Sequence, residues 1–128
     1  MPFDARSLAL LAAGGAAGTL ARTGVSAWAA GRWGDGFPWG TLIVNAAGCF
    51  LIGVLGTLCQ RGTLGPEAKL AAVTGLLGAF TTFSAFSFET WGLVQAGNWS
   101  GALLNVGLSL GAGFAALAAG VGLARALA

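Results

Sequence analysis

Apolar residues dominate the whole chain, and polar residues interrupt them only over short stretches. Four apolar segments cover about residues 7–30, 39–59, 70–96 and 102–124. Each segment is long enough for a membrane-spanning helix, which needs about 20 predominantly apolar residues. The pattern therefore predicts an all-α membrane protein with one domain, residues 1–128, built from four transmembrane helices.

The short connectors between these segments carry turn and helix-start residues. Pro38 suits the first turn of the second helix, and Pro66 suits the first turn of the third. Aromatic residues gather near the predicted span ends, where belts form at membrane interfaces. They are Trp33, Phe37, Trp39, Trp91 and Trp99.

Composition excludes several classes of protein. Only 8% of the residues are charged, whereas a soluble domain carries about a quarter. With a net charge of +2 the chain forms no basic patch for nucleic acid. The sequence has no histidine, no cluster of cysteines and carboxylates, and no nucleophile–base pair, so we expect neither a transition-metal site nor an enzyme.

The two cysteines and the basic residues give weaker indications, of disulfide formation and of membrane orientation respectively. Cys49 and Cys59 lie ten residues apart on one predicted helix, a rise of about 15 Å that is too long for a disulfide. Basic residues favour both termini inside the cell. The bias rests on few charges, so insertion in both orientations stays open.

Glycine is far more abundant than four plain lipid-facing helices require, with 23 residues. Gly14 and Gly18, like Gly107 and Gly111, have the four-residue spacing that lets membrane helices approach closely. We expect packing within and between subunits. Because four short helices enclose little volume, an aqueous path requires a second copy of the chain, and the sequence predicts a homo-oligomer.

Polar residues form stripes on the second and fourth predicted helices. Thr41, Asn45 and Gly48 share one helical face, and Asn45 is either an interhelical hydrogen-bonding group or a donor to a passing anion. Asn105 and Ser109 form a similar stripe on the last helix. There, helix packing and pore lining are equally compatible with the spacing.

The third predicted helix contains the densest polar cluster. Thr81 and Thr82 either bond carbonyls one turn earlier or, with Gly75 and Gly78 nearby, mark a local break in the helix. A break would free carbonyls for a small cation and amide N–H groups for an anion.

Phenylalanines and two charges complete the candidate residues. Phe83 and Phe86 belong to a packing stripe or present positive ring edges to an anion. Arg22 reaches the interface or attracts anions into a vestibule. Glu89, as an intramembrane carboxylate, is a proton carrier, a cation site or the partner of a basic residue unless it lies at the interface.

Taken together, these motifs resemble the bacterial fluoride channel family known as Fluc or CrcB. Three pieces carry the resemblance, and they occur in order along almost the whole chain. They are Gly14-Gly15-Ala16-Ala17-Gly18 with Arg22, Trp39-Gly40-Thr41-Leu42-Ile43-Val44-Asn45 with Gly48, and the run from Thr74-Gly75 to Phe86.

The resemblance implies an antiparallel, dual-topology homodimer in the bacterial inner membrane. Two pores per dimer would pass fluoride passively out of the cytoplasm and relieve fluoride toxicity. It also implies a third helix that is broken in mid-membrane and a structural sodium ion at the dimer interface. The partners would then be fluoride, sodium, membrane lipid and a second copy of the chain.

The resemblance also implies a role for each matching residue. Asn45 corresponds to the pore asparagine, and Phe83 and Phe86 to the rings that face fluoride. Gly78 and Thr81 supply sodium-binding carbonyls, and Arg22 and Glu89 match vestibule charges. The polar pore lining is completed by Thr41, Ser84 and Ser109.

The chain departs from the family at one pore position. Many relatives have a tyrosine four residues before the serine of the fourth helix, and this chain has Asn105 there. An amide is also a donor, so the change is compatible with a pore, but the fluoride path along this helix is open.

Two other functions fit parts of the sequence. A proton-coupled small multidrug exporter would use Glu89 as its membrane carboxylate, which leaves the hydroxyl and phenylalanine run unexplained. A packing subunit without transport would explain the glycines alone.

Overall fold

The computed structural model describes residues 3–127. Four helical spans follow one another, and the described residues contain no strand. Helix α1 (Ala5–Trp33), α2 (Trp39–Gln60) and α6 (Trp99–Leu127) are continuous. The third span, Pro66–Gln95, consists of α3 (Pro66–Ala68), the π-helix η1 (Lys69–Leu77), α4 (Gly78–Phe80) and α5 (Phe83–Gln95).

The four spans are all long and apolar enough to cross a membrane, as the sequence predicts. The first helix begins earlier than expected because Asp4 caps it, accepting the Ser7 N–H at 2.8 Å. It ends at Gly34, whose φ of 75° suits a residue without a side chain. Pro66 lies in the first turn of the third span, as expected.

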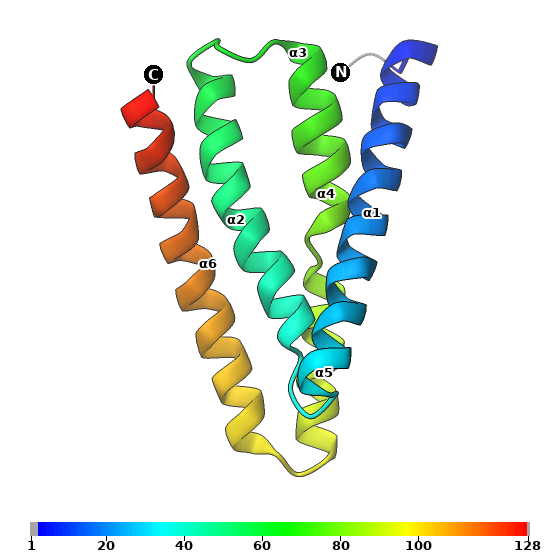
Figure 1. Ribbon diagram of the computed structural model, residues 1–128, viewed down its shortest axis with the longest axis vertical. Helices are drawn as coiled ribbons and strands as arrows, with labels where there is room; N and C mark the ends of the chain where they lie inside the picture. Colours follow the sequence, from blue (N-terminus) through cyan, green and yellow to red (C-terminus); the bar gives the residue numbers. More distant parts are fainter. Residues whose placement is uncertain (1–2, 128) are drawn as a thin grey trace.

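Helix α2 lies between α6 and the third span, and α1 packs on the opposite side of that span (Figure 1). A Cβ atom at Gly14 or Gly18 would overlap a carbonyl oxygen of η1. In the same way, a Cβ atom at Gly53 of α2 or Gly120 of α6 would overlap a backbone oxygen of the other helix. Glycine therefore allows backbone-to-backbone contact in both helix pairs.

The second predicted glycine pair behaves differently. A Cβ atom at Gly107 or Gly111 would meet nothing within 4 Å, and both glycines lie on an exposed face of α6. The neighbouring Leu103, Leu110 and Phe114 are also exposed. This face of α6 therefore has no packing partner within the described part of the chain.

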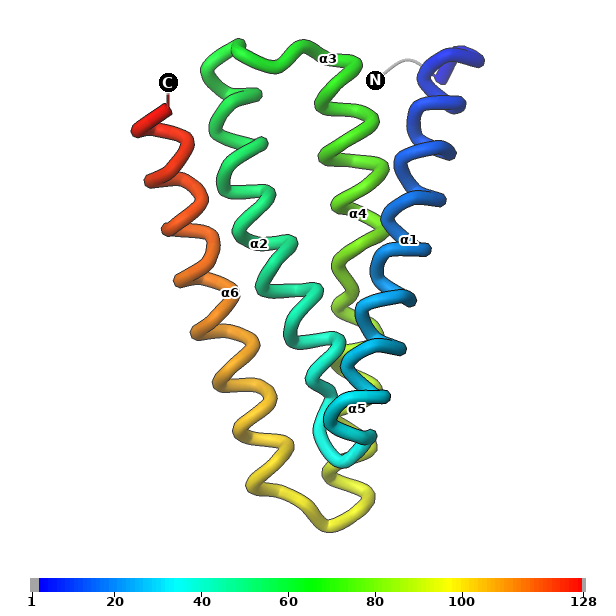
Figure 2. Tube along the Cα trace, viewed as in Figure 1, coloured from blue at the N-terminus to red at the C-terminus, as the bar shows by residue number. Residues whose placement is uncertain are grey.

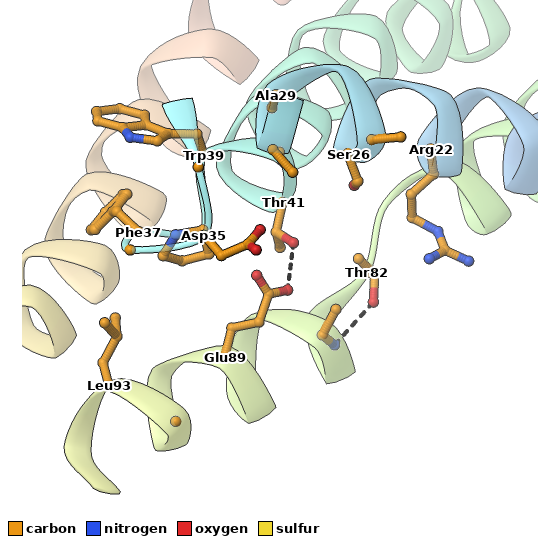
Figure 3. Close-up of a pocket in the computed structure, with 18 of the residues that line it drawn as sticks. Arg22, Ser26, Ala29, Asp35, Phe37, Trp39, Thr41, Thr82, Glu89 and Leu93 are labelled. Carbon is orange, nitrogen blue, oxygen red and sulfur yellow. Dashed lines mark hydrogen bonds between the residues drawn. The ribbon is translucent and has the colours of Figure 1, made fainter. Parts of the chain in front are cut away.

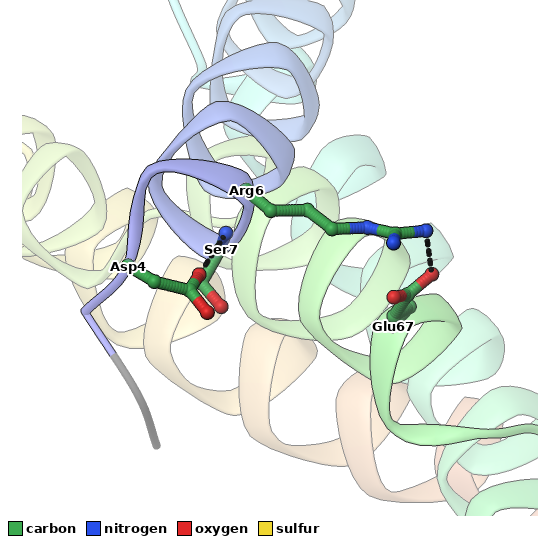
Figure 4. A network of polar contacts seen from close by, with 4 residues as sticks. All are labelled: Asp4, Arg6, Ser7 and Glu67. Atoms are coloured by element: carbon green, nitrogen blue, oxygen red, sulfur yellow. Dashed lines mark hydrogen bonds and ion pairs between the residues drawn. The ribbon is translucent and has the colours of Figure 1, made fainter.

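Both ends of the described chain lie at one end of the bundle, together with the α2–α3 connection (Figure 1). At that end Arg6 of α1 forms an exposed ion pair of 2.9 Å with Glu67 of α3 (Figure 4). At the opposite end, the ring of Trp33 packs 5.2 Å from Trp28 and 6.0 Å from Trp39. The bundle thus has a charged end and an aromatic end.

Candidate functional site

The helical path of the third span is interrupted at Thr81 and Thr82. Both residues have extended backbone angles, with ψ of 154° and 113°, and the trace leaves the helical coil between α4 and α5 (Figure 2). The Thr81 hydroxyl donates to the Leu77 carbonyl one turn earlier, whereas the Thr82 hydroxyl accepts the Ala85 N–H and caps α5. The two neighbouring threonines therefore have different roles.

Asn45 of α2 replaces the backbone hydrogen bonds that the interruption removes. Its Nδ2 donates to the Thr82 carbonyl at 3.0 Å, and its Oδ1 accepts the Thr82 N–H at 2.8 Å. The side-chain amide thus pairs with a single residue through both of its polar atoms. The amide therefore acts as an interhelical hydrogen-bonding group. The second N–H of Nδ2 is not used in these two bonds.

Two carbonyls of the interrupted segment lose their usual helical donors. The Thr82 N–H would bond the Gly78 carbonyl in a continuous helix, but it donates to Asn45. The Ala85 N–H would bond the Thr81 carbonyl, but it donates to the Thr82 hydroxyl. Gly78 and Thr81 are the two carbonyls that the resemblance assigns to sodium.

Arg22 stabilises the same segment from the other side. Its Nε donates to the Ala79 carbonyl at 3.1 Å. This carbonyl belongs to the last turn before the interruption, where a helix carries partial negative charge. The guanidinium therefore acts on the end of α4, and it does so near a cleft that its side chain helps to line.

A groove of about 460 Å³ runs along the interrupted segment. Most of the predicted pore and sodium residues line it, and they come from α2, α4, α5, α6 and the extended segment. They are Asn45, Gly78, Thr81, Phe83, Phe86 and Ser109.

The two phenylalanine rings lie together on the wall of this groove. Their centroids are 5.6 Å apart and their planes are tilted by 57°. Phe83 is 78% exposed in the single chain. A ring of this size on the surface indicates that lipid or another protein surface covers it.

A larger cleft of about 850 Å³ lies near the aromatic end of the bundle, with Phe37 and Trp39 in its lining. Within it the Thr41 hydroxyl donates to Glu89 Oε1 at 2.6 Å, as Figure 3 shows. Thr82 lines both the cleft and the groove, so the interrupted segment lies between them. The structure therefore brings Thr41, Glu89 and Arg22 to one cavity.

Ser84, which the resemblance assigns to the pore lining, lies outside both cavities. It is exposed, and its hydroxyl lies 3.3 Å from the Thr82 hydroxyl. Its role as pore lining stays a prediction.

Sequence reasoning missed two polar residues beside these cavities. Asp35 lines the cleft and faces the Thr41–Glu89 pair in Figure 3. Thr90 of α5 accepts a hydrogen bond of 2.9 Å from Asn105 of α6. A carboxylate in a connector and a hydroxyl late in a span gave no spacing signal that could identify them.

Comparison with known proteins identifies similar sequences over most of the chain. A family model described as CrcB-like protein, Camphor Resistance (CrcB), matches residues 9–121. The fluoride-specific ion channel FluC of Roseiflexus sp. (strain RS-1) is 52% identical over 118 residues, which are 91% of this chain and 95% of that protein.

Two further relatives have the same name. A FluC of Thermus thermophilus is 53% identical over 95 residues, or 74% of this chain and 75% of that protein. A FluC of Chloroflexus aurantiacus is 46% identical over 116 residues, or 90% of this chain and 92% of that protein.

Proposed function

The chain belongs to the CrcB family, and on that premise we propose that it is a channel that conducts fluoride passively across the membrane. It is a multi-pass membrane protein with four spans, and a channel makes and breaks no covalent bonds, so it is not an enzyme. We place it in the bacterial inner membrane, where fluoride export from the cytoplasm would relieve toxicity.

The observation that carries this proposal is the convergence of Asn45, Phe83, Phe86 and Ser109 on one groove. These residues come from three helices and offer uncharged donors and ring edges. Because relatives that match nearly the whole chain are named fluoride-specific ion channels, the groove is best explained as part of an ion path.

These groups suit a small and strongly hydrated anion. The ion loses water on entering the membrane, so donors in the channel must replace that water without binding the ion too tightly. Asn45 keeps one N–H beyond the one it gives to Thr82. The first N–H groups of α5 add partial positive charge beside the groove.

We place the interruption near the middle of the bilayer. Thr81 and Thr82 are the sixteenth and seventeenth residues of the thirty-residue span that begins at Pro66 (81 − 65 and 82 − 65). Irregular backbone at that depth is tolerated only when it is buried in protein or lines a cavity. The contacts to Asn45 and Arg22 and the adjacent groove meet that condition.

An antiparallel homodimer of dual topology completes the proposal, with two pores per dimer. The groove is open, Phe83 is exposed on its wall, and the glycine face of α6 has no partner within residues 3–127. A second copy placed on this side would cover all three features. The chain has too few charged residues to favour one orientation strongly, and this is compatible with insertion in both orientations.

The carbonyls of Gly78 and Thr81 fit a structural sodium ion. Their usual donors are diverted to Asn45 and Thr82, and a hard cation prefers oxygen ligands. Gly78 and Thr81 of one chain supply two such oxygens, fewer than a hard cation usually takes. The ion would therefore be shared between two copies, and it would supply a fixed positive charge that holds their interrupted segments together.

The proposed function is tested by purified protein in liposomes loaded with fluoride or with chloride. We expect rapid fluoride efflux at the electrode once a potassium ionophore relieves the voltage, and much slower chloride efflux. A pH gradient should not drive the flux. Fluoride efflux no faster than from protein-free liposomes would contradict the proposal.

The same assay separates the two other functions that fit parts of the sequence. Flux that requires a proton gradient would indicate an exporter that uses Glu89, and no observation of the structure favours it. Liposomes that release neither ion would indicate a packing subunit.

Replacing sodium by N-methylglucamine throughout purification should lower fluoride flux or dimer stability, and unchanged dimer stability and flux would contradict the sodium proposal.

A further inference from the structure

A series of hydrogen bonds connects α5 and α6, two of the helices that line the groove. The Ser109 hydroxyl donates to Asn105 Oδ1 at 3.4 Å, Asn105 Nδ2 donates to Thr90 Oγ1 at 2.9 Å, and the Thr90 hydroxyl donates to the Phe86 carbonyl at 2.7 Å. The series begins and ends at residues that line the groove, Ser109 and Phe86. Its two central residues lie behind the groove wall.

Asn105 is the buried centre of this series. It is 1% exposed, and it is one of the two largest fully buried side chains of the described residues. Among the side-chain hydrogen bonds within residues 3–127, only the Asn105–Thr90 bond connects α5 to α6. Helix α5 also packs less extensively on α6 than α2 does, so one hydrogen bond has a large share in fixing their separation.

The bond from Ser109 is longer than a typical O–H···O bond, which is about 2.5 to 3.0 Å. The Ser109 hydroxyl can therefore turn toward the groove at small cost, whereas the shorter Asn105–Thr90 bond stays formed. The two bonds of Asn105 therefore differ in strength. The bond to Thr90 holds α5 and α6 together, whereas the Ser109 hydroxyl is available to contact an ion.

We propose that Asn105 is a positioning residue that, through Thr90, fixes the distance between Ser109 and the Phe86 ring and so sets the selectivity of the groove for fluoride over chloride. The inference rests on the proposed function, because it concerns the path of that ion. A looser α5–α6 contact widens the groove, and a wider groove admits the larger halide. Thr90 has the same role, since its hydroxyl oxygen accepts this hydrogen bond from Asn105.

The experiment compares permeability ratios of fluoride and chloride in liposomes for wild type, Asn105→Leu, Thr90→Val and the double variant. Each single variant should lower the ratio about threefold to tenfold, the range that corresponds to one interhelical hydrogen bond in a membrane. The double variant should be no worse than either single variant, because both changes remove the same bond. Thr90→Ser keeps the hydroxyl and should retain the wild-type ratio.

Thr57→Val is the matched control. Thr57 is buried and, like Thr90, its hydroxyl donates to a carbonyl four residues earlier, that of Gly53, but it lies on α2 and does not line the groove. Elution as a single species shows that each variant folds. If Asn105→Leu does not fold, Thr90→Val, which keeps the side-chain shape, still tests the inference.

The possible outcomes separate this inference from the proposed function. If folded Asn105→Leu and Thr90→Val keep the wild-type ratio, or if their effects add, the inference is wrong while the channel function stands. If wild type conducts no fluoride, the proposed function fails first.

Discussion

At the scale of single residues, the Asn45 amide determines the backbone of another helix. It makes two hydrogen bonds to Thr82, which lies 37 positions away in the sequence. A side chain that pairs with both polar groups of one residue acts as a substitute for a neighbouring turn of helix. The same residue has a second N–H beside the groove, so its structural role is compatible with its proposed role as a donor to the ion.

Asn45→Ala should therefore reduce both stability and flux. The variant leaves the Thr82 N–H and carbonyl unpaired, which costs about 1–3 kcal/mol for a buried group. Thermal unfolding in detergent and fluoride efflux from liposomes would measure the two effects. A variant with wild-type efflux would remove Asn45 from the ion path.

Phe83→Leu should reduce fluoride efflux and leave the stability of the single chain almost unchanged, because the ring is 78% exposed in the single chain. An aliphatic side chain of similar length has no positive ring edge for an anion. Phe88 is also exposed on α5 but does not line the groove, so Phe88→Leu is the matched control. Equal efflux from both variants would contradict the role of the Phe83 ring.

At the scale of elements, close contact between glycine and carbonyl oxygen holds α1 against η1. Gly18→Ala would force its Cβ into the Leu76 carbonyl, so we expect a loss of about 1–3 kcal/mol in unfolding free energy. Gly15→Ala is the matched control, since nothing lies within 4 Å of its Cβ. Unfolding titrations of both variants in mixed detergent micelles would measure the difference, and equal stability would contradict close packing of α1 on η1.

The start of α1 provides a test that depends on pH. The Ser7 backbone N–H, and then the Ser7 hydroxyl, lower the pKa of Asp4 below its ordinary value of 3.8. A carboxyl whose pKa is lowered by folding stabilises the protein above its unfolded pKa, and this contribution is lost as the pH falls through the folded pKa. The midpoint of thermal unfolding of Asp4→Ala should lie below that of wild type at neutral pH, and the difference should shrink as the pH falls below 3.8. A pH-independent difference would contradict the carboxylate cap.

The sequence predicts these elements to different degrees. Hydropathy gives the four spans, because length and composition are sufficient for that purpose. The adjacent Thr81 and Thr82 indicate where the third span departs from helical geometry. The π-helix from Lys69 to Leu77 was not predicted, since α- and π-helices have no distinguishing composition.

The candidate site was also predicted only in part from the sequence. Asn45, Phe83, Phe86 and Ser109 were identified by their motif, and the structure brings them to one groove. The partners of Asn105 were not predicted. Thr90 lies fifteen residues earlier on another helix, and only the packing of α5 on α6 determines that the two side chains meet.

At the scale of the whole molecule, the open side of the bundle is the feature that a second copy would cover. Gly111→Ile adds a side chain where the single chain has free space, so it should leave the fold of each copy unchanged. In the proposed dimer it would prevent close approach of α6, and the variant should elute from size exclusion as a monomer. Gly122→Ile is the matched control on the same helix, with equally free space near its end. A dimeric Gly111→Ile variant would place this face outside the interface.

The position of the two chain ends has a consequence for engineering a single-gene version of the proposed dimer. Both ends of the described chain lie at the same end of the bundle because the number of spans is even (Figure 1). A short soluble linker between two copies would therefore force both into the same orientation. A tandem fusion that reproduces an inverted pair needs a linker that itself crosses the bilayer.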